Sequence, residues 1–125
     1  MIIKCYKDNV FIPKWNGNKK EADPIKIKHR YLTPEERDKY FYYQPLKVTP
    51  KTDGYEVVLV EDKKGCCKAI VIGIENFALE VNGEKIVIDT VKKLYETEGV
   101  PNALIKEIEE YMSNASPVID EKSLK

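Results

Sequence analysis

The stretch KIKHRYLTPEERDKYFYY, residues 26–43, places a strand pattern, a helix start and an aromatic cluster directly after one another. Within residues 24–31, Ile25, Ile27 and His29 alternate with basic residues. Such alternation puts one face of a strand on a core and the other face in water. This segment is therefore predicted to be a half-buried β-strand.

The same stretch contains a strong helix start. Thr33 can accept a hydrogen bond from a free backbone N–H of the first turn, and Pro34 loses nothing at the first helical position. Glu36 can reach back to the backbone of the cap, which completes a capping box. A helix is predicted to begin here and to end near Tyr43, because Pro45 cannot continue it.

Two short apolar runs, residues 2–6 and 10–15, precede this stretch and are separated by Lys-Asp-Asn, whose side chains suit a tight turn. They are predicted to form a β-hairpin, followed by an exposed turn or loop at residues 16–20. With the alternating strand and the capped helix, residues 1–50 are predicted to form a β-rich half that contains a small antiparallel sheet.

The middle of the chain leaves two interpretations open. Residues 44–54 contain Pro45, Pro50 and Gly54 and are predicted to be a linker or an ordered loop. Between residues 55 and 75, two β-branched runs fit a hairpin, whereas a polar stripe at helical spacing fits a helix. The stripe consists of Glu61, Lys64, Lys68 and Glu75. Local rules do not decide between a hairpin and a helix here.

A second hairpin is predicted over residues 78–88. Asn82-Gly83 lies at its centre, and both central residues of a type I′ turn need positive φ. Asp89 or Thr90 then caps a short predicted helix, which Gly99 ends in the position that a left-handed C-cap prefers.

Pro101 opens the last clear helix of the sequence. Its apolar residues recur at the spacing of one helix face, so this face is either core or a groove for a partner. They are Leu104, Ile105, Ile108, Tyr111 and Met112. Residues 51–113 are thus predicted to be a mainly helical half, and residues 114–125 a flexible tail.

The chain is long enough for one domain with its own core. It has 125 residues, of which 42% are hydrophobic and 34% charged, which is enough aliphatic content to drive collapse. We therefore predict a single α+β domain: a small N-terminal antiparallel β-sheet with a capped helix, followed by a mainly helical C-terminal half with one β-hairpin.

Charge and cysteine content indicate a cytoplasmic protein. Three cysteines cannot all pair within one chain, and reduced thiols fit best. Neither a signal peptide core nor the roughly 18 apolar residues of a membrane span is found, so no membrane partner is expected.

Residues 1–51 carry 12 basic and 6 acidic side chains, and the remainder of the chain carries 9 basic and 15 acidic side chains, so copies could attract one another head to tail. The alternative is that folding mixes these charges.

A catalytic or metal site needs convergent polar groups, and few are available. His29 is the only histidine, and its place on the apolar side of a strand favours a structural, hydrogen-bonded role. Cys66-Cys67 lacks the two-residue spacer of metal and redox motifs. Gly-rich phosphate loops are absent from the sequence. We expect no catalytic residue, no metal and no cofactor, and hence no enzyme.

Nucleic-acid binding is a weaker alternative. Lys26, Lys28 and Arg30 could contact phosphates while tyrosines stack on bases. Three basic side chains on one strand face are ordinary for a surface, however, and the formal net charge of the chain is zero. No nucleic-acid partner is expected.

Two long stretches taken together resemble the small tail assembly chaperones of long-tailed phages and prophages. The first is FIPKWNGNKKEADPIKIKHRYLTPEERDKY, with an apolar strand, a Trp, a Gly-containing turn, a Pro-Ile strand and Leu-Thr before an acidic helix start. The second is IENFALEVNGEKIVIDTVKKLYETEGVPNALIKEIEEYMSNASPVIDEKSLK, with Asn-Gly, a Thr-capped helix, an amphipathic helix and a polar tail. The resemblance covers roughly residues 9–43 and 74–125; the middle and its Cys66-Cys67 pair do not match.

The resemblance implies a non-enzymatic protein of the bacterial host cytoplasm that binds the tape measure protein, and as a second partner the tail tube protein. It also implies a helix over residues 64–74 and a surface for an apolar helical stripe. The candidate partner-binding residues are Tyr40, Tyr43, Leu104, Ile105, Ile108, Tyr111 and Met112. For each of them the alternative is the core of the domain itself. The alternative function is a structural tail or head-to-tail accessory subunit that stays in the virion, and a homo-oligomer suits both.

Overall fold

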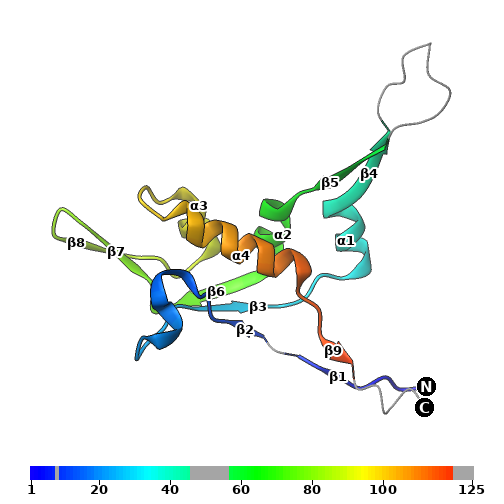
Figure 1. Cartoon of the computed structure of the whole chain (residues 1–125), viewed down its shortest axis with the longest axis horizontal. Coiled ribbons are helices and arrows are strands. Elements are labelled where there is room, and N and C mark those ends of the chain that lie inside the picture. Colours follow the sequence, from blue (N-terminus) through cyan, green and yellow to red (C-terminus); the bar gives the residue numbers. More distant parts are fainter. Residues whose placement is uncertain (8, 46–56, 120–125) are drawn as a thin grey trace, which may run out of the picture.

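The computed structural model describes residues 1–7, 9–45 and 57–119, and it is a mixed α+β protein with several small antiparallel sheets (Figure 1). This confirms the predicted α+β class. In chain order, the helices and strands are β1 (Cys5–Tyr6), β2 (Val10–Phe11), η1 (Trp15–Lys20), β3 (Lys26–His29), α1 (Pro34–Tyr40), β4 (Phe41–Pro45), β5 (Val57–Glu61), α2 (Lys63–Ile70), β6 (Val71–Glu75), β7 (Ala78–Val81), β8 (Glu84–Val87), α3 (Val91–Glu96), α4 (Asn102–Asn114) and β9 (Val118–Ile119).

A three-stranded sheet with the order β2-β3-β6 lies at the centre of the fold. Its middle strand β3 is the alternating segment, and Ile27 is fully buried while Lys28 points to solvent, as the alternation predicts. Ile27 lies opposite Ile74 of β6. The sheet of the N-terminal half is thus completed by a strand from the C-terminal half, which the sequence did not predict.

The predicted hairpin between residues 2–6 and 10–15 is wrong. β2 pairs with β3, with Val10 opposite Lys28, and β1 pairs with β9 at the other end of the chain. Pairing with β3 places Phe11 beside Ile27 at the edge of the core, which a local hairpin would not do.

The flexible tail predicted from residue 114 is corrected as well. Asn114 is the last residue of α4, and β9 is a strand paired with β1. Residues 120–125 lie outside the described residues.

Residues 16–20 are exposed, as predicted, except for Asn18, but they are not an irregular turn or loop. They belong to η1, a short 3-10 segment in which Asn16 and Gly17 have left-handed φ values of 50° and 71°. The side chain of Asn18 is buried and holds the segment by three hydrogen bonds to backbone groups of Pro13 and Ile25. The amide of Asn18 therefore replaces the sheet or helix bonds that these backbone groups lack.

The helix start at Thr33 is confirmed in full. Thr33 Oγ1 accepts a hydrogen bond from the N–H of Glu36 at 3.1 Å, and Glu36 Oε1 accepts one from the N–H of Thr33 at 3.1 Å. The predicted end near Tyr43 is wrong, because α1 stops at Tyr40 and the next residues form β4, paired with β5. Cross-strand pairing of aromatic and β-branched residues outweighs a further helical turn here.

The open question over residues 55–75 has a mixed answer. β5 is a strand, but its partner is β4 rather than residues 69–74. Asp62 then caps α2 by accepting a hydrogen bond from the N–H of Gly65 at 2.9 Å. The helix predicted over residues 64–74 is right as far as Ile70 and wrong from Val71, where β6 joins the central sheet. Most of the linker predicted over residues 44–54 lies outside the described residues.

The hairpin predicted over residues 78–88 is confirmed as β7 and β8, with φ values of 52° at Asn82 and 83° at Gly83. Thr90 caps α3, as predicted, by accepting a hydrogen bond from the N–H of Lys93. The last helix, α4, is confirmed after Pro101.

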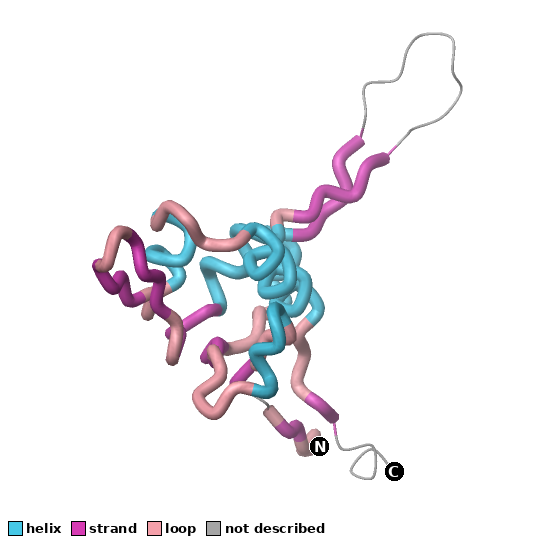
Figure 2. Tube along the Cα trace, turned by 60° about the vertical axis from the view of Figure 1, so that its left-hand side comes forward, coloured by secondary structure: helices cyan, strands magenta, loops and turns pink. Residues whose placement is uncertain are grey.

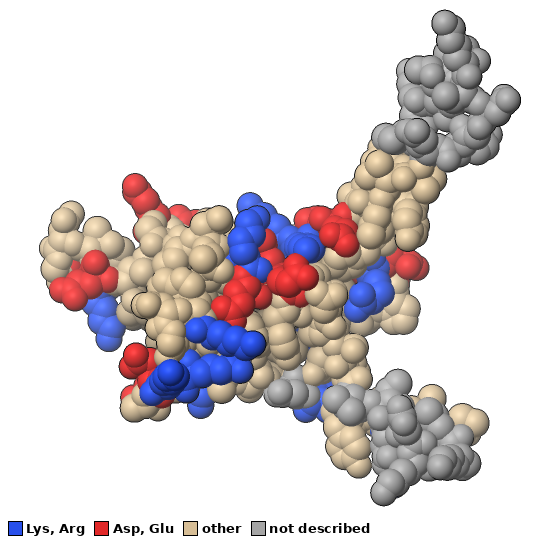
Figure 3. Space-filling view, in the orientation of Figure 1, with Lys and Arg blue, Asp and Glu red and all other residues tan. Residues whose placement is uncertain are grey.

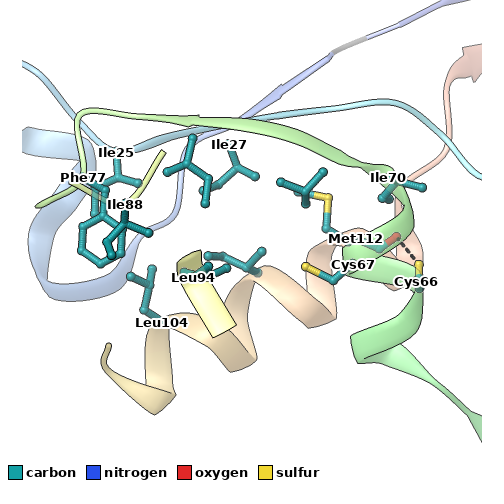
Figure 4. Packing of buried hydrophobic residues seen from close by; sticks show 13 residues of the cluster. Ile25, Ile27, Cys66, Cys67, Ile70, Phe77, Ile88, Leu94, Leu104 and Met112 are labelled. Carbon is teal, nitrogen blue, oxygen red and sulfur yellow. Dashed lines mark hydrogen bonds between the residues drawn. The ribbon is translucent and has the colours of Figure 1, made fainter. Parts of the chain in front are cut away.

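One hydrophobic core joins the inner face of the central sheet to α2, α3 and α4 (Figure 4). Ile27, Cys67, Leu94 and Met112 come from four different elements and are at most 1% exposed. The opposite face of the sheet is open: Ile72 is 71% exposed, and a Cβ added at Gly73 would meet no atom within 4 Å. The described residues thus form two layers and leave one face of the central sheet uncovered.

Candidate protein-binding surface

Three of the predicted partner-binding residues on α4 lie in the core. Leu104, Ile108 and Met112 are all 0% exposed and pack against the sheet and α2. A partner cannot reach these side chains in the folded chain, so the expectation of a partner groove is wrong for them. The periodic apolar face of α4 is the core face.

Ile105 and Tyr111, on the same helix, are half-buried at the edge of the core. The ring of Tyr111 stacks on Phe11, with centroids 3.9 Å apart and planes 8° from parallel. The stack forms part of the wall of a largely apolar groove. The groove is lined by Phe11, Lys14, Glu107, Glu110, Tyr111, Asn114 and Ala115. These contacts dock β2 against α4.

The two predicted tyrosines before Pro45 lie in different environments. Tyr40, the last residue of α1, is half-buried and packs against the core. Tyr43 lies on β4 and is 70% exposed. Of the seven predicted residues, Tyr43 is therefore the one that offers a large accessible apolar side chain.

Tyr43 belongs to a surface that we call the apolar ribbon: residues 41–45 and 57–60, that is β4 and β5 without Glu61. Figures 1 and 2 show this two-stranded ribbon projecting from the body of the molecule, away from the core helices. None of its nine residues is charged, in a chain of which 34% is charged. Figure 3 shows it as an uncharged surface, whereas acidic and basic side chains cover much of the body.

Both faces of the apolar ribbon carry accessible apolar side chains. Tyr43 and Leu59 are cross-strand partners on one face, and Tyr42 and Val58 lie on the other. Five ribbon residues are between 44% and 70% exposed: Tyr42, Tyr43, Val57, Val58 and Leu59. A strand that covers its own core alternates apolar and polar residues, and the ribbon departs from this pattern because accessible apolar side chains lie on both of its faces.

The base of the ribbon is fixed to the body. The N–H of Asp62 donates a hydrogen bond of 2.8 Å to the carbonyl of Tyr40, directly below the last cross-strand pair. Tyr40 packs over Gly65, where an added Cβ would collide with the carboxylate of Asp62 and come within 2.9 Å of the ring. Lys63 then forms a 2.6 Å ion pair with Glu110 of α4. The ribbon is therefore held at the junction of α1 and α2.

Sequence reasoning missed the β5 half of this surface. The signal was present in Val57-Val58-Leu59-Val60, an uncharged β-branched run, but the hairpin considered for it would have buried it against residues 69–74. The aromatic run was assigned to the end of a helix, so the pairing of the two runs was not foreseen.

His29 has the structural role that was predicted. It is 1% exposed, and its Nδ1 lies 2.8 Å from the carbonyl oxygen of Arg30. Its ring makes edge-on contacts with Tyr31 and Tyr111. The Nε2 atom is enclosed without a hydrogen-bond partner among the described residues.

Cys66 and Cys67 are both buried, since α2 packs on α4 and α3 together. The thiol of Cys66 contacts the carbonyl oxygen of Met112 at 3.6 Å (Figure 4). Burial raises the pKa of each thiol to about 11, so both are protonated at neutral pH. No group of three His, Cys, Asp or Glu side chains suited to a metal ion occurs among residues 1–7, 9–45 and 57–119.

Two of the three basic side chains of the alternating segment are paired with carboxylates. Lys28 forms a 2.8 Å ion pair with Glu75, and Arg30 contacts both oxygens of Glu36 at 2.6 and 2.7 Å. The guanidinium of Arg30 lowers the pKa of Glu36 to about 2. This face therefore presents less unpaired positive charge than the sequence suggests.

Comparisons of this chain with models of protein families, with curated proteins and with solved structures found no match. Within the described part of the chain, none of the helices has the length and apolar character needed to cross a membrane.

Proposed function

We propose that the protein is a non-enzymatic binding protein for other polypeptides and that the apolar ribbon is its contact surface. The observation that carries this proposal is the ribbon itself: nine uncharged residues, accessible on both faces, held away from a charged body. Water contact with such a surface is unfavourable, and covering it with an apolar partner recovers about 25 cal/mol for each Å² of apolar area.

The dimensions of the ribbon suit a helical client. Five residues of a strand extend roughly 16 Å at a rise of about 3.3 Å per residue. An α-helix covers the same length in about three turns of 5.4 Å each, so about five residues of an apolar stripe would lie along one ribbon face. Tyr43 and Leu59 on that face supply aromatic and aliphatic contacts typical of binding hot spots.

This chemistry is what the resemblance to tail assembly chaperones leads us to expect. We propose the tape measure protein as the client, with the tail tube protein as a second partner, in the cytoplasm of a bacterial host. A long helical client with an exposed apolar stripe needs a reversible cover before the tail tube encloses it. The apolar ribbon, whose side chains are accessible, supports this proposal better than α4, whose apolar face is buried in the core.

The proposal is tested by co-expressing the chain with the tape measure protein of the same genetic element and capturing the complex. A double variant, Tyr43→Ser with Leu59→Ser, removes the two apolar side chains of one cross-strand pair. We expect at least about a tenfold loss of affinity, since hot-spot truncations cost about 2 kcal/mol or more. Ile72→Ser is the matched control, because Ile72 is as exposed as Tyr43 but lies on the open face of the central sheet.

Equal capture of both variants and the wild-type chain would overturn the ribbon as the contact surface. Failure of the wild-type chain to bind or solubilise the client would overturn the chaperone function. Mass spectrometry of purified particles separates this function from the structural alternative, because a chaperone is absent from the virion and an accessory subunit is present.

A further inference from the structure

The second strand of the apolar ribbon has an outer edge that lacks the usual protection. β4 and β5 form a two-stranded sheet on their own, so each presents one row of backbone groups that no strand of the described chain pairs with. Natural edge strands are blunted by charged residues, proline, bulges or a covering element. β4 ends in Pro45, whereas Val57 to Val60 of β5 contain neither proline nor charge, and the register with β4 is unbroken.

A two-stranded ribbon in water is also marginal by itself, since three or more strands or a covering helix are needed for independent stability. The base of this ribbon is anchored at Tyr40 and Asp62, but its outer part rests on no other described element. A further strand along β5 would satisfy the free backbone groups and stabilise the ribbon at once.

We propose that two copies of this chain pair through the outer edges of their β5 strands, antiparallel about a two-fold axis, to give a four-stranded sheet. With the axis at Val58, Val58 lies opposite Val58 of the second copy, and Val57 and Leu59 each lie opposite the other in the second copy, so opposed side chains share a face. Each of these pairs is aliphatic, and Glu61 falls outside the paired region. The strand is self-complementary, as a two-fold interface requires.

Two further observations favour a second copy over an unrelated strand. The chain has zero formal net charge, so copies do not repel one another through their overall fields. The ribbon projects from the body, so two copies can meet at their ribbons while the charged bodies stay apart (Figures 1 and 2). The contact is small, and we expect a reversible dimer whose population depends on concentration.

Pairing through the edge leaves both faces of the ribbon accessible and doubles their width. A client helix would then find four strands instead of two. This consequence rests on the proposed function, whereas the dimer itself does not depend on it.

The experiment compares two lysine substitutions at one cross-strand pair. Val58 of β5 lies opposite Gln44 of β4 on the same face of the ribbon. In the proposed dimer, the two copies of Val58 lie on adjacent strands, whereas the two copies of Gln44 are three strand spacings apart, or about 14 Å at 4.8 Å each. Sedimentation of the wild-type chain up to about 1 mM should show a monomer–dimer equilibrium. Val58→Lys should raise the dissociation constant of the dimer at least about tenfold, and Gln44→Lys should change it little.

Spin labels give a second readout that does not depend on charge. With Cys5→Ser as background, a label at Leu59→Cys should show strong dipolar broadening in the dimer, and a label at its cross-strand partner Tyr43→Cys much weaker broadening. A chain that stays monomeric up to about 1 mM overturns the proposal, as does a dimer that Gln44→Lys weakens more than Val58→Lys. If the chain captures the client but forms no dimer, the proposed function holds and the dimer is refuted. If the chain forms the dimer but captures no client, the dimer holds and the proposed function is refuted.

Discussion

The backbone N–H of Trp15 donates a hydrogen bond of 2.9 Å to Oε1 of Glu107, a residue 92 positions further along the chain. The N–H of Lys14 donates to Oε2 of the same carboxylate at 2.6 Å. Lys14 is the N-cap of η1, and its side chain has no acceptor to cap the helix. Glu107, on α4, therefore supplies the cap that the local sequence lacks and ties the N-terminal segment to the last helix.

We predict that Glu107→Ala lowers the free energy of unfolding by about 1–2 kcal/mol, because two backbone N–H groups lose a charged acceptor. Glu107→Gln keeps one acceptor oxygen and should lower the free energy of unfolding by less than Glu107→Ala does. Urea denaturation followed by circular dichroism measures both changes. Glu96→Ala, at an exposed glutamate of α3, is the control and should stay within about 0.5 kcal/mol of wild type. A loss no larger than that of the control would show that the cap contributes nothing.

The ion pair between Arg30 and Glu36 predicts an acid-dependent loss of stability. The guanidinium of Arg30, followed by the backbone N–H of Thr33, lowers the pKa of Glu36 from 4.5 to about 2. A carboxylate with a lowered pKa stabilises the folded state fully above its unfolded pKa, and this contribution is lost as the pH falls towards the folded pKa. The difference in urea midpoint between wild type and Glu36→Gln should therefore be constant above about pH 5 and shrink towards pH 2. Glu35→Gln, one residue earlier, is the control, and an identical profile for it would contradict the assignment.

Local sequence signals predicted those elements whose cause is local. The capping box at Thr33 and the turn at Asn82-Gly83 are decided by residues within a few positions of each other, and both are as predicted. The failures have long-range causes. β2 takes its partner from β3 and β1 from β9, and no property of residues 2–15 alone indicates which strand they will join. The buried amide of Asn18 likewise turns an apparently polar loop into a fixed segment.

The sequence predicted an apolar surface with tyrosines, but it placed most of that surface on α4 instead of on β4 and β5. An amphipathic helix has the same pattern whether its apolar face meets its own core or a partner, and burial of Leu104, Ile108 and Met112 decides the question for α4. Tyr43 was found because it belongs to an aromatic run. Its partner Leu59 was not, because cross-strand neighbours sixteen positions apart share no local pattern.

The division between core and ribbon predicts opposite effects of truncation. Met112→Ala should lower the free energy of unfolding by about 2–5 kcal/mol, because the side chain is fully buried and leaves a cavity. Ile105→Ala, on the same helix but half-buried, should cost clearly less. Tyr43→Ser should change stability by about 1 kcal/mol or less while it weakens client capture. Thermal and urea unfolding of the three variants measure these differences. A large loss of stability in Tyr43→Ser would mean that the ribbon serves the fold rather than a partner.

The three cysteines should differ sharply in reactivity. Cys5 is exposed on β1, whereas Cys66 and Cys67 are 0% exposed and burial raises the pKa of each to about 11. Because the thiolate is the reactive form, an aromatic disulfide reagent at neutral pH should modify one thiol per folded chain rapidly and the other two only as the chain unfolds. In denaturant all three thiols should react rapidly, and Cys5→Ser should abolish the rapid phase of modification in the folded chain. Rapid modification of either remaining thiol in the folded Cys5→Ser chain would contradict the burial of Cys66 and Cys67 in the core.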